Sequence, residues 1–399
     1  MLYNGLYNEL KSAFQKLNSE TVIESLDVKI CRKTFNSSPV FIEEPFSITT
    51  GTNSQTTNKL YRDSYSERKD DEIKDNLRFD YFMFESPEKS KKPGLIFLFH
   101  GLNEKKWEKY LPWAYQLTKL TGKTVILFPI AFHMNRAPSA WSDSRLMQKL
   151  ATERAGKSTN SHSSFANAAI SERLDSSPHR FFLSGWQTYN DFYKLIKSIR
   201  AGEITGIPSD TGIDLFGYSI GAFFSLLLMM DNPGNLLGLS KLFIFCGGST
   251  YDKTDPVSKY IVDKSASTSV SMHFDKLLAD RRLVEVFLDH YFRKFAIRKS
   301  FFPGLMNYEK FKGLREVRMR QIQERIYTVV LKNDFVIVPS QVKVSLCGES
   351  SINSLRVEEM DFDFPYSHIT PFPVSEKYKQ KVDYAFLQTM EKAGDYLIN

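Results

Sequence analysis

Cysteine is scarce in this chain of 399 residues, which has three, at Cys31, Cys246 and Cys347. Their wide separation excludes a disulfide framework, and no pair has the spacing of a metal site. We therefore expect a reducing compartment and a cytoplasmic protein. Long hydrophobic runs are missing too: the longest uncharged stretch, Leu215–Met230, has 16 residues. Since a bilayer span needs about 20, a transmembrane segment is not expected.

Charge of one sign does not dominate the sequence, which has 53 basic and 46 acidic residues and a net charge of +7. No zinc finger, RNA-binding motif or glycine-rich phosphate loop accompanies the basic residues, so a nucleic-acid partner is not expected. HExxH, clustered His and carboxylate residues and a dinucleotide fingerprint are absent as well, so neither metal nor cofactor is expected. Small basic clusters indicate solvated helix faces, and a weak attraction to anionic substrates or to membrane surfaces is left open. These clusters are Lys89–Lys92, Arg293–Lys299 and Lys312–Arg320.

Aromatic residues are abundant, at 14% with 32 Phe and 19 Tyr, and the hydrophobic content of 42% is that of a globular protein. Such a composition favours a well-packed interior or an apolar pocket. The first 20 residues carry charges at Glu9, Lys11, Lys16 and Glu20, within what would be the apolar part of a signal peptide. They predict an amphipathic helix and not a signal peptide.

Several short apolar runs bounded by turn residues predict buried strands. The five clearest are Gly94–Phe99, Thr124–Pro129, Gly212–Gly217, Lys241–Cys246 and Ile326–Leu331. Because consecutive positions are apolar, neither face of these strands can lie in water, which is typical of parallel strands covered by helices on both faces. Weaker patterns add strands at Glu24–Ile30 and Phe79–Ser86 and an edge strand at Leu355–Phe362.

Helical patterns lie between these strands, at Trp107–Leu120 and Gly221–Met230. Alternation of strands and helices predicts an α/β fold with a doubly wound, mostly parallel sheet. Two connections, at about 131–211 and 249–324, are 81 and 76 residues long and must contain structure of their own. We expect a helix near Tyr189–Arg200 in the first and an amphipathic helix over Phe274–Phe301 in the second, and together they are candidates for a helical cap over a site.

The most informative motif is Gly217-Tyr218-Ser219-Ile220-Gly221, of the form G-x-S-x-G, between an apolar strand and an apolar helix. A serine in so sharp a turn has its hydroxyl exposed, and the turn tolerates only small flanking residues, hence the glycines. The helix that follows points unpaired N–H groups at the reacting centre. The backbone N–H of Ile220 then becomes an oxyanion donor.

This motif in this context resembles the α/β-hydrolase superfamily, and Phe99-His100-Gly101-Leu102-Asn103 at the end of an earlier strand adds to the resemblance. The resemblance covers roughly Phe79 to the C-terminus. It implies that Leu102 or Asn103 supplies a second oxyanion N–H and that His100 is structural. It also implies an acid after a later strand and a histidine after the last one.

Both residues are present in that order. Asp334 follows the strand Ile326–Leu331, and His368 follows the candidate last strand. Serine needs a base to take its proton, imidazole has a suitable pKa, and a carboxylate fixes its tautomer. Asp252, Asp361 or Asp363 could take the place of Asp334.

Three more residues are tentative substrate-binding candidates. His133 and Arg136 follow the second strand, at the same edge of the sheet as the elbow, and could bind a carboxylate or phosphate; the alternative is a structured turn that packs against the cap. Asn103 follows the HG segment. Trp141 and Trp186 could line an acyl pocket or fill the core.

The sequence thus predicts a serine hydrolase that acts on a small-molecule ester or related acyl compound through Ser219, His368 and Asp334. The alternatives are a non-catalytic binding protein of the same fold and a membrane-surface lipase, docked on lipid through the N-terminal helix and the basic clusters. We expect an N-terminal arm and linker over residues 1–75, with Thr49–Asn58 and Arg62–Lys74 exposed, and the hydrolase domain over 76–399.

Overall fold

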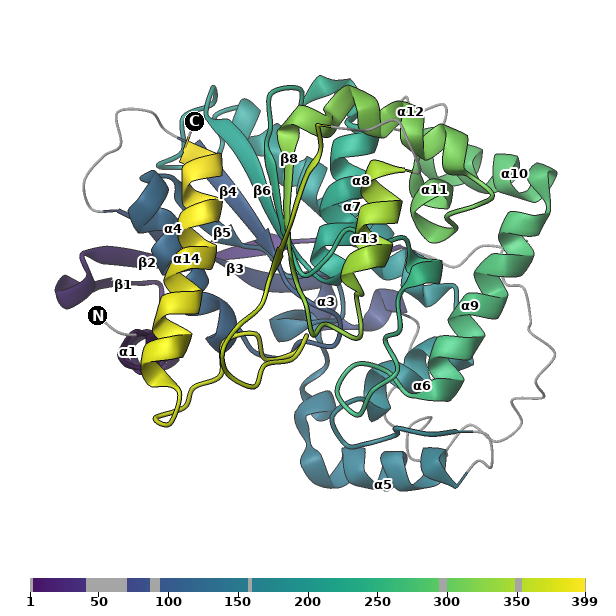
Figure 1. The fold of residues 1–399 in the computed structure, drawn as a ribbon, viewed down its shortest axis with the longest axis horizontal. Helices are drawn as coiled ribbons and strands as arrows, with labels where there is room; N and C mark the ends of the chain where they lie inside the picture. Colours follow the sequence, from purple (N-terminus) through teal and green to yellow (C-terminus); the bar gives the residue numbers. More distant parts are fainter. Residues whose placement is uncertain are drawn as a thin grey trace.

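The computed structural model describes residues 3–40, 70–86, 94–156, 160–293, 300–348 and 354–398. In this part of the chain one sheet of nine strands has the order β1-β2-β3-β5-β4-β6-β7-β8-β9 (Figure 1). Strands β4 to β9 are mutually parallel, and β1, β2 and β3 continue the sheet antiparallel at one edge. The strands are β1 (Glu20–Ile23), β2 (Val28–Asn36), β3 (Arg78–Glu85), β4 (Gly94–Phe99), β5 (Thr124–Leu127), β6 (Gly212–Tyr218), β7 (Leu242–Phe245), β8 (Ile326–Leu331) and β9 (Arg356–Met360).

The central strands are buried on both faces, as their continuous apolar runs predict. In β4, Phe97 and Phe99 contribute to one hydrophobic cluster, while Ile96 and Leu98 contribute to the cluster on the opposite face. All six residues of the strand are buried. A strand with water on one face would instead alternate apolar and polar residues.

Helices cover both faces of the sheet (Figure 1). One face is covered by α1 (Tyr3–Gln15), α4 (Leu111–Thr121) and α14 (Lys379–Ile398). The other is covered by α7 (Arg180–Arg200), α8 (Ile220–Asp231), α12 (Lys312–Ile322) and α13 (Pro339–Cys347). The predicted fold class, an α/β fold with a doubly wound and mostly parallel sheet, is confirmed.

The apolar face of the N-terminal helix α1 packs against the rest of the protein. Tyr3, Leu6 and Leu10 are buried in the cluster that α4 and α14 also form. The ring of Tyr3 lies 4.7 Å from that of Phe386 on α14. The apolar face that a lipid surface would need is therefore already covered.

Both long connections are built from helices. The first contains α5 (Ser144–Ala155), α6 (Ala168–Ser176) and α7, and the second contains α9 (Lys264–Ala279), α10 (Arg281–Phe292), α11 (Phe302–Met306) and α12. The prediction of a single amphipathic helix over Phe274–Phe301 is wrong, because α9 ends before Asp280 and α10 begins after it. The carboxylate of Asp280 accepts hydrogen bonds from the N–H groups of Arg282 (2.9 Å) and Leu283 (3.1 Å) and so begins a new helix.

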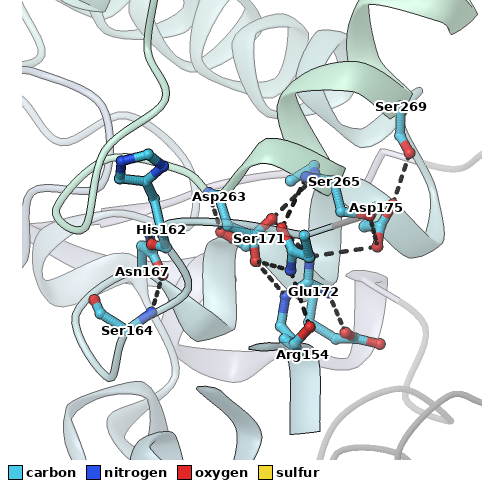
Figure 2. Close-up of polar contacts among 12 residues, drawn as sticks. Arg154, His162, Ser164, Asn167, Ser171, Glu172, Asp175, Asp263, Ser265 and Ser269 are labelled. Carbon is cyan, nitrogen blue, oxygen red and sulfur yellow. Dashed lines mark hydrogen bonds and ion pairs between the residues drawn. The ribbon is translucent and has the colours of Figure 1, made fainter. Parts of the chain in front are cut away.

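A buried ion-pair network joins the two connections (Figure 2). Arg154 of α5 donates two hydrogen bonds, of 2.6 and 2.8 Å, to the carboxylate of Asp263, and it also pairs with Glu172 and Asp175 of α6. Asp263 in turn caps α9 by accepting from the N–H of Ala266. Burial opposes ionisation of Asp263, but the hydrogen bonds from Arg154 lower its pKa. The network holds α5, α6 and α9 together as one unit.

Near the N-terminus the structure differs from the expected strand over Glu24–Ile30. Residues Glu24–Leu26 form a 3₁₀ turn, and Asp27 has a φ of 47°, so that the chain reverses between β1 and β2. The expected linker lies almost wholly outside the described residues, as do Lys89–Lys92 and residues 294–299 of the second basic cluster. The domain boundary near residue 75 stays a prediction.

Candidate active site

Ser219 lies in a sharp turn between β6 and α8. Its backbone has φ 56° and ψ −122°, a conformation that residues with a side chain rarely adopt. The flanking glycines are required by contact: a Cβ on Gly217 would lie 2.6 Å from Cα of Ala222, and one on Gly221 would lie 2.4 Å from the carbonyl oxygen of Phe99. The G-x-S-x-G motif is thus a packing requirement of this strand–helix junction.

The structure brings three of the predicted residues together in one hydrogen-bonded chain. Nε2 of His368 lies 2.8 Å from Oγ of Ser219, and Nδ1 lies 2.7 Å from Oδ2 of Asp334. Since a carboxylate only accepts, Nδ1 carries the proton and Nε2 is free to accept from the serine hydroxyl. The second oxygen of Asp334 accepts from the N–H groups of Val336 (3.0 Å) and Ile337 (2.9 Å), which fixes the carboxylate. The three side chains belong to residues less than a tenth exposed.

The other candidate carboxylates are held elsewhere. Asp361 pairs with Lys332, Asp363 pairs with Lys381, and Asp252 accepts from the backbone N–H of Tyr308. Among these four candidate carboxylates, Asp334 is the one that contacts His368.

Ile220 and Leu102 are the predicted sources of the oxyanion N–H groups, and both lie close to Ser219. Ile220 is the first residue of α8, so its N–H precedes the first hydrogen bond within the helix. Leu102 follows β4, which pairs in register with β6 so that Phe99 lies opposite Gly217. Leu102 and Ser219 line the same cavity.

His100 is a buried structural residue. Its Nε2 accepts from the N–H of Ile130 (2.9 Å), so Nδ1 must donate to the carbonyl of Gly101 (2.8 Å). Burial, together with nearby positive groups, lowers the pKa of His100 well below its usual value. A neutral ring with both nitrogens occupied holds the ends of β4 and β5 together.

A polar network that the sequence did not reveal supports the loop after β4. The N–H of Gly101 donates to the hydroxyl of Tyr110 (2.9 Å), and that hydroxyl donates to Glu104 (3.0 Å). Lys109 pairs with Glu104 and also donates to the carbonyl of Ile369 (3.1 Å), next to His368. The loop after β4 and the loop that carries His368 are therefore tied to one lysine.

Tyr218, to which the sequence assigned no role, lies beneath the histidine. Its ring stacks on that of His368, with centroids 5.5 Å apart, and its hydroxyl donates to the carbonyl of His368. Nζ of Lys109 lies 4.6 Å above the same tyrosine ring.

Arg136, a tentative substrate-binding residue, is turned into the core instead. It is fully buried and its guanidinium donates to the side chain and carbonyl of Asn76, to the carbonyl of Pro129 and to Asp191 (2.9 Å). The plane of its guanidinium lies over the ring of Phe79. With these donors engaged, Arg136 has a structural role.

Asn103 is also committed to protein contacts. Its amide donates to the carbonyls of Ala166 (2.9 Å) and Tyr260 (2.6 Å), one in each long connection. It has a φ of 60°. Asn103 therefore fixes both connections to the loop after β4, although it does line the cavity beside Ser219.

Two cavities of different character meet at this site. One is lined by polar residues and by Ser219 and His368, together with Phe165 and Tyr260 from the two connections. The other is apolar and includes His133 and Trp186, whereas Trp141 lies in the core. Both are lined by Leu102, in the loop after β4.

Within the part of the chain that the structure describes, no group of His, Cys, Asp and Glu side chains could hold a metal ion. No helix among the described residues is long and apolar enough to span a bilayer.

Residues 1–398 match the family described as "Family of unknown function (DUF6051)", and the chain belongs to that family. The comparison with curated proteins found no match. Among solved structures, the chain is similar to carboxyl esterase 2 from the fungus Tuber melanosporum, with 7% identity, all of both chains covered and a TM-score of 0.44.

Two further similar structures are a thermostable esterase from Pseudomonas putida and the peroxisomal α/β-hydrolase Lpx1 from Saccharomyces cerevisiae. The first shares 9% identity over 98% of this chain and 89% of that chain, with a TM-score of 0.40. The second shares 14% identity over 92% and 90%, also with a TM-score of 0.40. Identities and scores this low carry no information on substrate, so the function of this chain has to be inferred from its own site.

Proposed function

We propose that this chain is a serine hydrolase that cleaves an ester bond through an acyl-enzyme. The observation that carries the proposal is the hydrogen-bonded chain from Asp334 through His368 to Ser219, on the wall of a cavity. Ion pairs or turn contacts alone would not require a serine in a strained backbone conformation beside them.

In the proposed reaction Oγ of Ser219 attacks the carbonyl carbon while its proton moves to Nε2 of His368. The imidazolium, held by Asp334, then gives that proton to the leaving alkoxide as the C–O bond breaks. Water repeats the sequence on the acyl-enzyme, releasing the acid and returning the proton to Ser219. Amides, thioesters and lactones would use the same groups, but an ester makes the least demand on the leaving-group acid.

The N–H groups of Ile220 and Leu102 would stabilise the oxyanion of the tetrahedral intermediates, at about 3 kcal/mol per donor. The two helical connections would act as a cap, since Phe165 and Tyr260 line the cavity next to Ser219. A small-molecule acyl substrate would enter between them.

A fluorophosphonate probe tests the proposal, because it reacts with an activated serine. We expect labelling of the native chain at Ser219, no labelling of Ser219→Ala, and a fall of about 10⁴-fold or more in ester hydrolysis for both Ser219→Ala and Asp334→Asn. An unlabelled native chain that folds normally would support the non-catalytic binding protein instead.

A further inference from the structure

The apolar cavity begins at the oxyanion positions, since Leu102 and Ile220 both line it. The rest of its wall consists mainly of large hydrophobic side chains, among them Leu174, Phe182, Trp186, Phe224 and Phe302. A carbonyl bound between the oxyanion donors could therefore extend its acyl chain into this space.

One polar group of this wall has an unused hydrogen-bonding atom. Nδ1 of His133 lies 2.9 Å from the carbonyl of Ala131, which can only accept, so Nδ1 carries the proton. Nε2 is then a bare acceptor, and it is buried with no hydrogen-bond partner among the described residues. The residue is 4% exposed, and burial lowers its pKa to about 4, so the ring is neutral at pH 7.

The loop holds His133 in this position at some cost. The residues on either side, Phe132 and Met134, have φ angles of 64° and 50°, in the left-handed region that side chains disfavour. The N–H of Phe132 is held by the side chain of Asn76. Backbone strain of this kind persists only where the surrounding structure imposes the conformation, and such positions cluster at functional sites.

We propose that this cavity takes acyl chains that carry a hydroxyl group, an inference that rests on the proposed function. The hydroxyl would donate a hydrogen bond to Nε2 of His133. A buried acceptor without a donor costs free energy, and a substrate hydroxyl removes that cost. An ammonium would bring an unpaired charge into an apolar cavity, and an amide would bring a carbonyl as well as a donor. A hydroxyl brings one neutral donor and otherwise matches the aliphatic and aromatic wall.

The test is a series of p-nitrophenyl esters in pairs, each unsubstituted acyl chain matched with chains that carry a hydroxyl at successive positions. For the position that reaches His133, we expect kcat/KM about tenfold above that of the unsubstituted ester. His133→Phe should abolish this preference, so that the kcat/KM of the hydroxy ester falls to that of its unsubstituted partner. His290→Phe, which changes an exposed histidine on α10, should keep it.

Binding to Ser219→Ala gives a second measurement that needs no chemistry. Calorimetry with a hydroxy acid and its unsubstituted analogue should show the same preference, lost when His133→Phe is added. Labelling of Ser219 by the probe without any hydroxyl preference overturns the inference and leaves the proposed function standing. Failure of the probe to label the native chain overturns the proposed function itself. If His133→Phe does not fold, the ester series measured with the native chain is the test. If no hydroxy ester then has a higher kcat/KM than its unsubstituted partner, the inference is overturned.

Discussion

Ser219 and its neighbours show how strongly close contacts can constrain a sequence. The backbone at Ser219 is strained by roughly 1–3 kcal/mol, and this strain is tolerated because β6 and α8 are packed on both sides of it. Gly221 lets α8 approach β4, where the carbonyl of Phe99 occupies the space of a Cβ. The same residue pattern that would expose a nucleophile also lets the strand and helix pack.

Gly221→Ala tests this packing. Its Cβ would lie 2.4 Å from a backbone oxygen, so α8 must move, and we expect a loss of more than about 3 kcal/mol of stability together with loss of fluorophosphonate labelling. Gly212→Ala is the control, because a Cβ there meets nothing within 4 Å. Equal melting temperatures for the two variants would contradict the contact.

Tyr218→Phe tests how the histidine is positioned. The tyrosine hydroxyl donates to the carbonyl of His368, so its removal should let the histidine loop shift while the ring stacking remains. We expect kcat to fall about tenfold with KM little changed, and stability to fall by about 1 kcal/mol. Tyr384→Phe, at an exposed tyrosine on α14, should leave kcat as it is. A change in KM alone would argue against a positioning role.

The sequence led to Ser219, His368 and Asp334 through the resemblance that the G-x-S-x-G motif and its context carry, which implies an acid after a later strand and a histidine after the last one. It left other acids open in place of Asp334. It was not sufficient for Arg136 and Asn103. Which partners satisfy their donors depends on Asp191, on Ala166 and on other groups distant in sequence. An arginine at a sheet edge can serve a substrate or the core equally well, and only the packing decides.

Among secondary-structure elements, the buried parallel strands were the easiest to predict and the helices of the two connections the hardest. A strand such as β4 is apolar at every position, and a short apolar run bounded by turn residues is typical of a buried strand. The break between α9 and α10 was missed because both have apolar residues at helical spacing and only the capping carboxylate of Asp280 separates them. The pairing of α5, α6 and α9 depends on Arg154, whose partners lie up to 109 residues away.

Arg154→Met should separate these helices. It removes the cation and leaves Asp263 and Glu172 buried without a partner of opposite charge among the described residues, and breaking a buried pair in this way costs about 3–5 kcal/mol. Arg145→Met on the same helix is the matched control, since Arg145 is exposed. Denaturant unfolding measures both, and a loss below about 1 kcal/mol for Arg154→Met would show that the network does not hold the connections together.

Across the protein, buried titratable groups link folding to pH. Burial lowers the pKa of His133 and His273 to about 4 and that of His179 to about 3, and that of His100 falls well below its usual value. Burial has the opposite effect on an acid and raises the pKa of Asp231 to about 7. These four histidines stay neutral in the folded chain but bind protons near pH 6.5 once it unfolds.

Stability contributed by these histidines is therefore present above pH 6.5 and lost as the pH falls towards 4. Near pH 5.5 unfolding binds almost one proton per histidine, while Asp231, protonated when folded, releases one. Because unfolding takes up protons on balance, we expect the free energy of unfolding to fall by roughly 3 kcal/mol for each unit by which the pH is lowered near 5.5. Asp231→Asn keeps an acceptor for the N–H of Phe301 but removes the opposing proton, so the slope should steepen by about 1 kcal/mol per pH unit. Urea unfolding at a series of pH values measures both slopes, and a flat profile between pH 6.5 and 4.5 would contradict the burial of these charges.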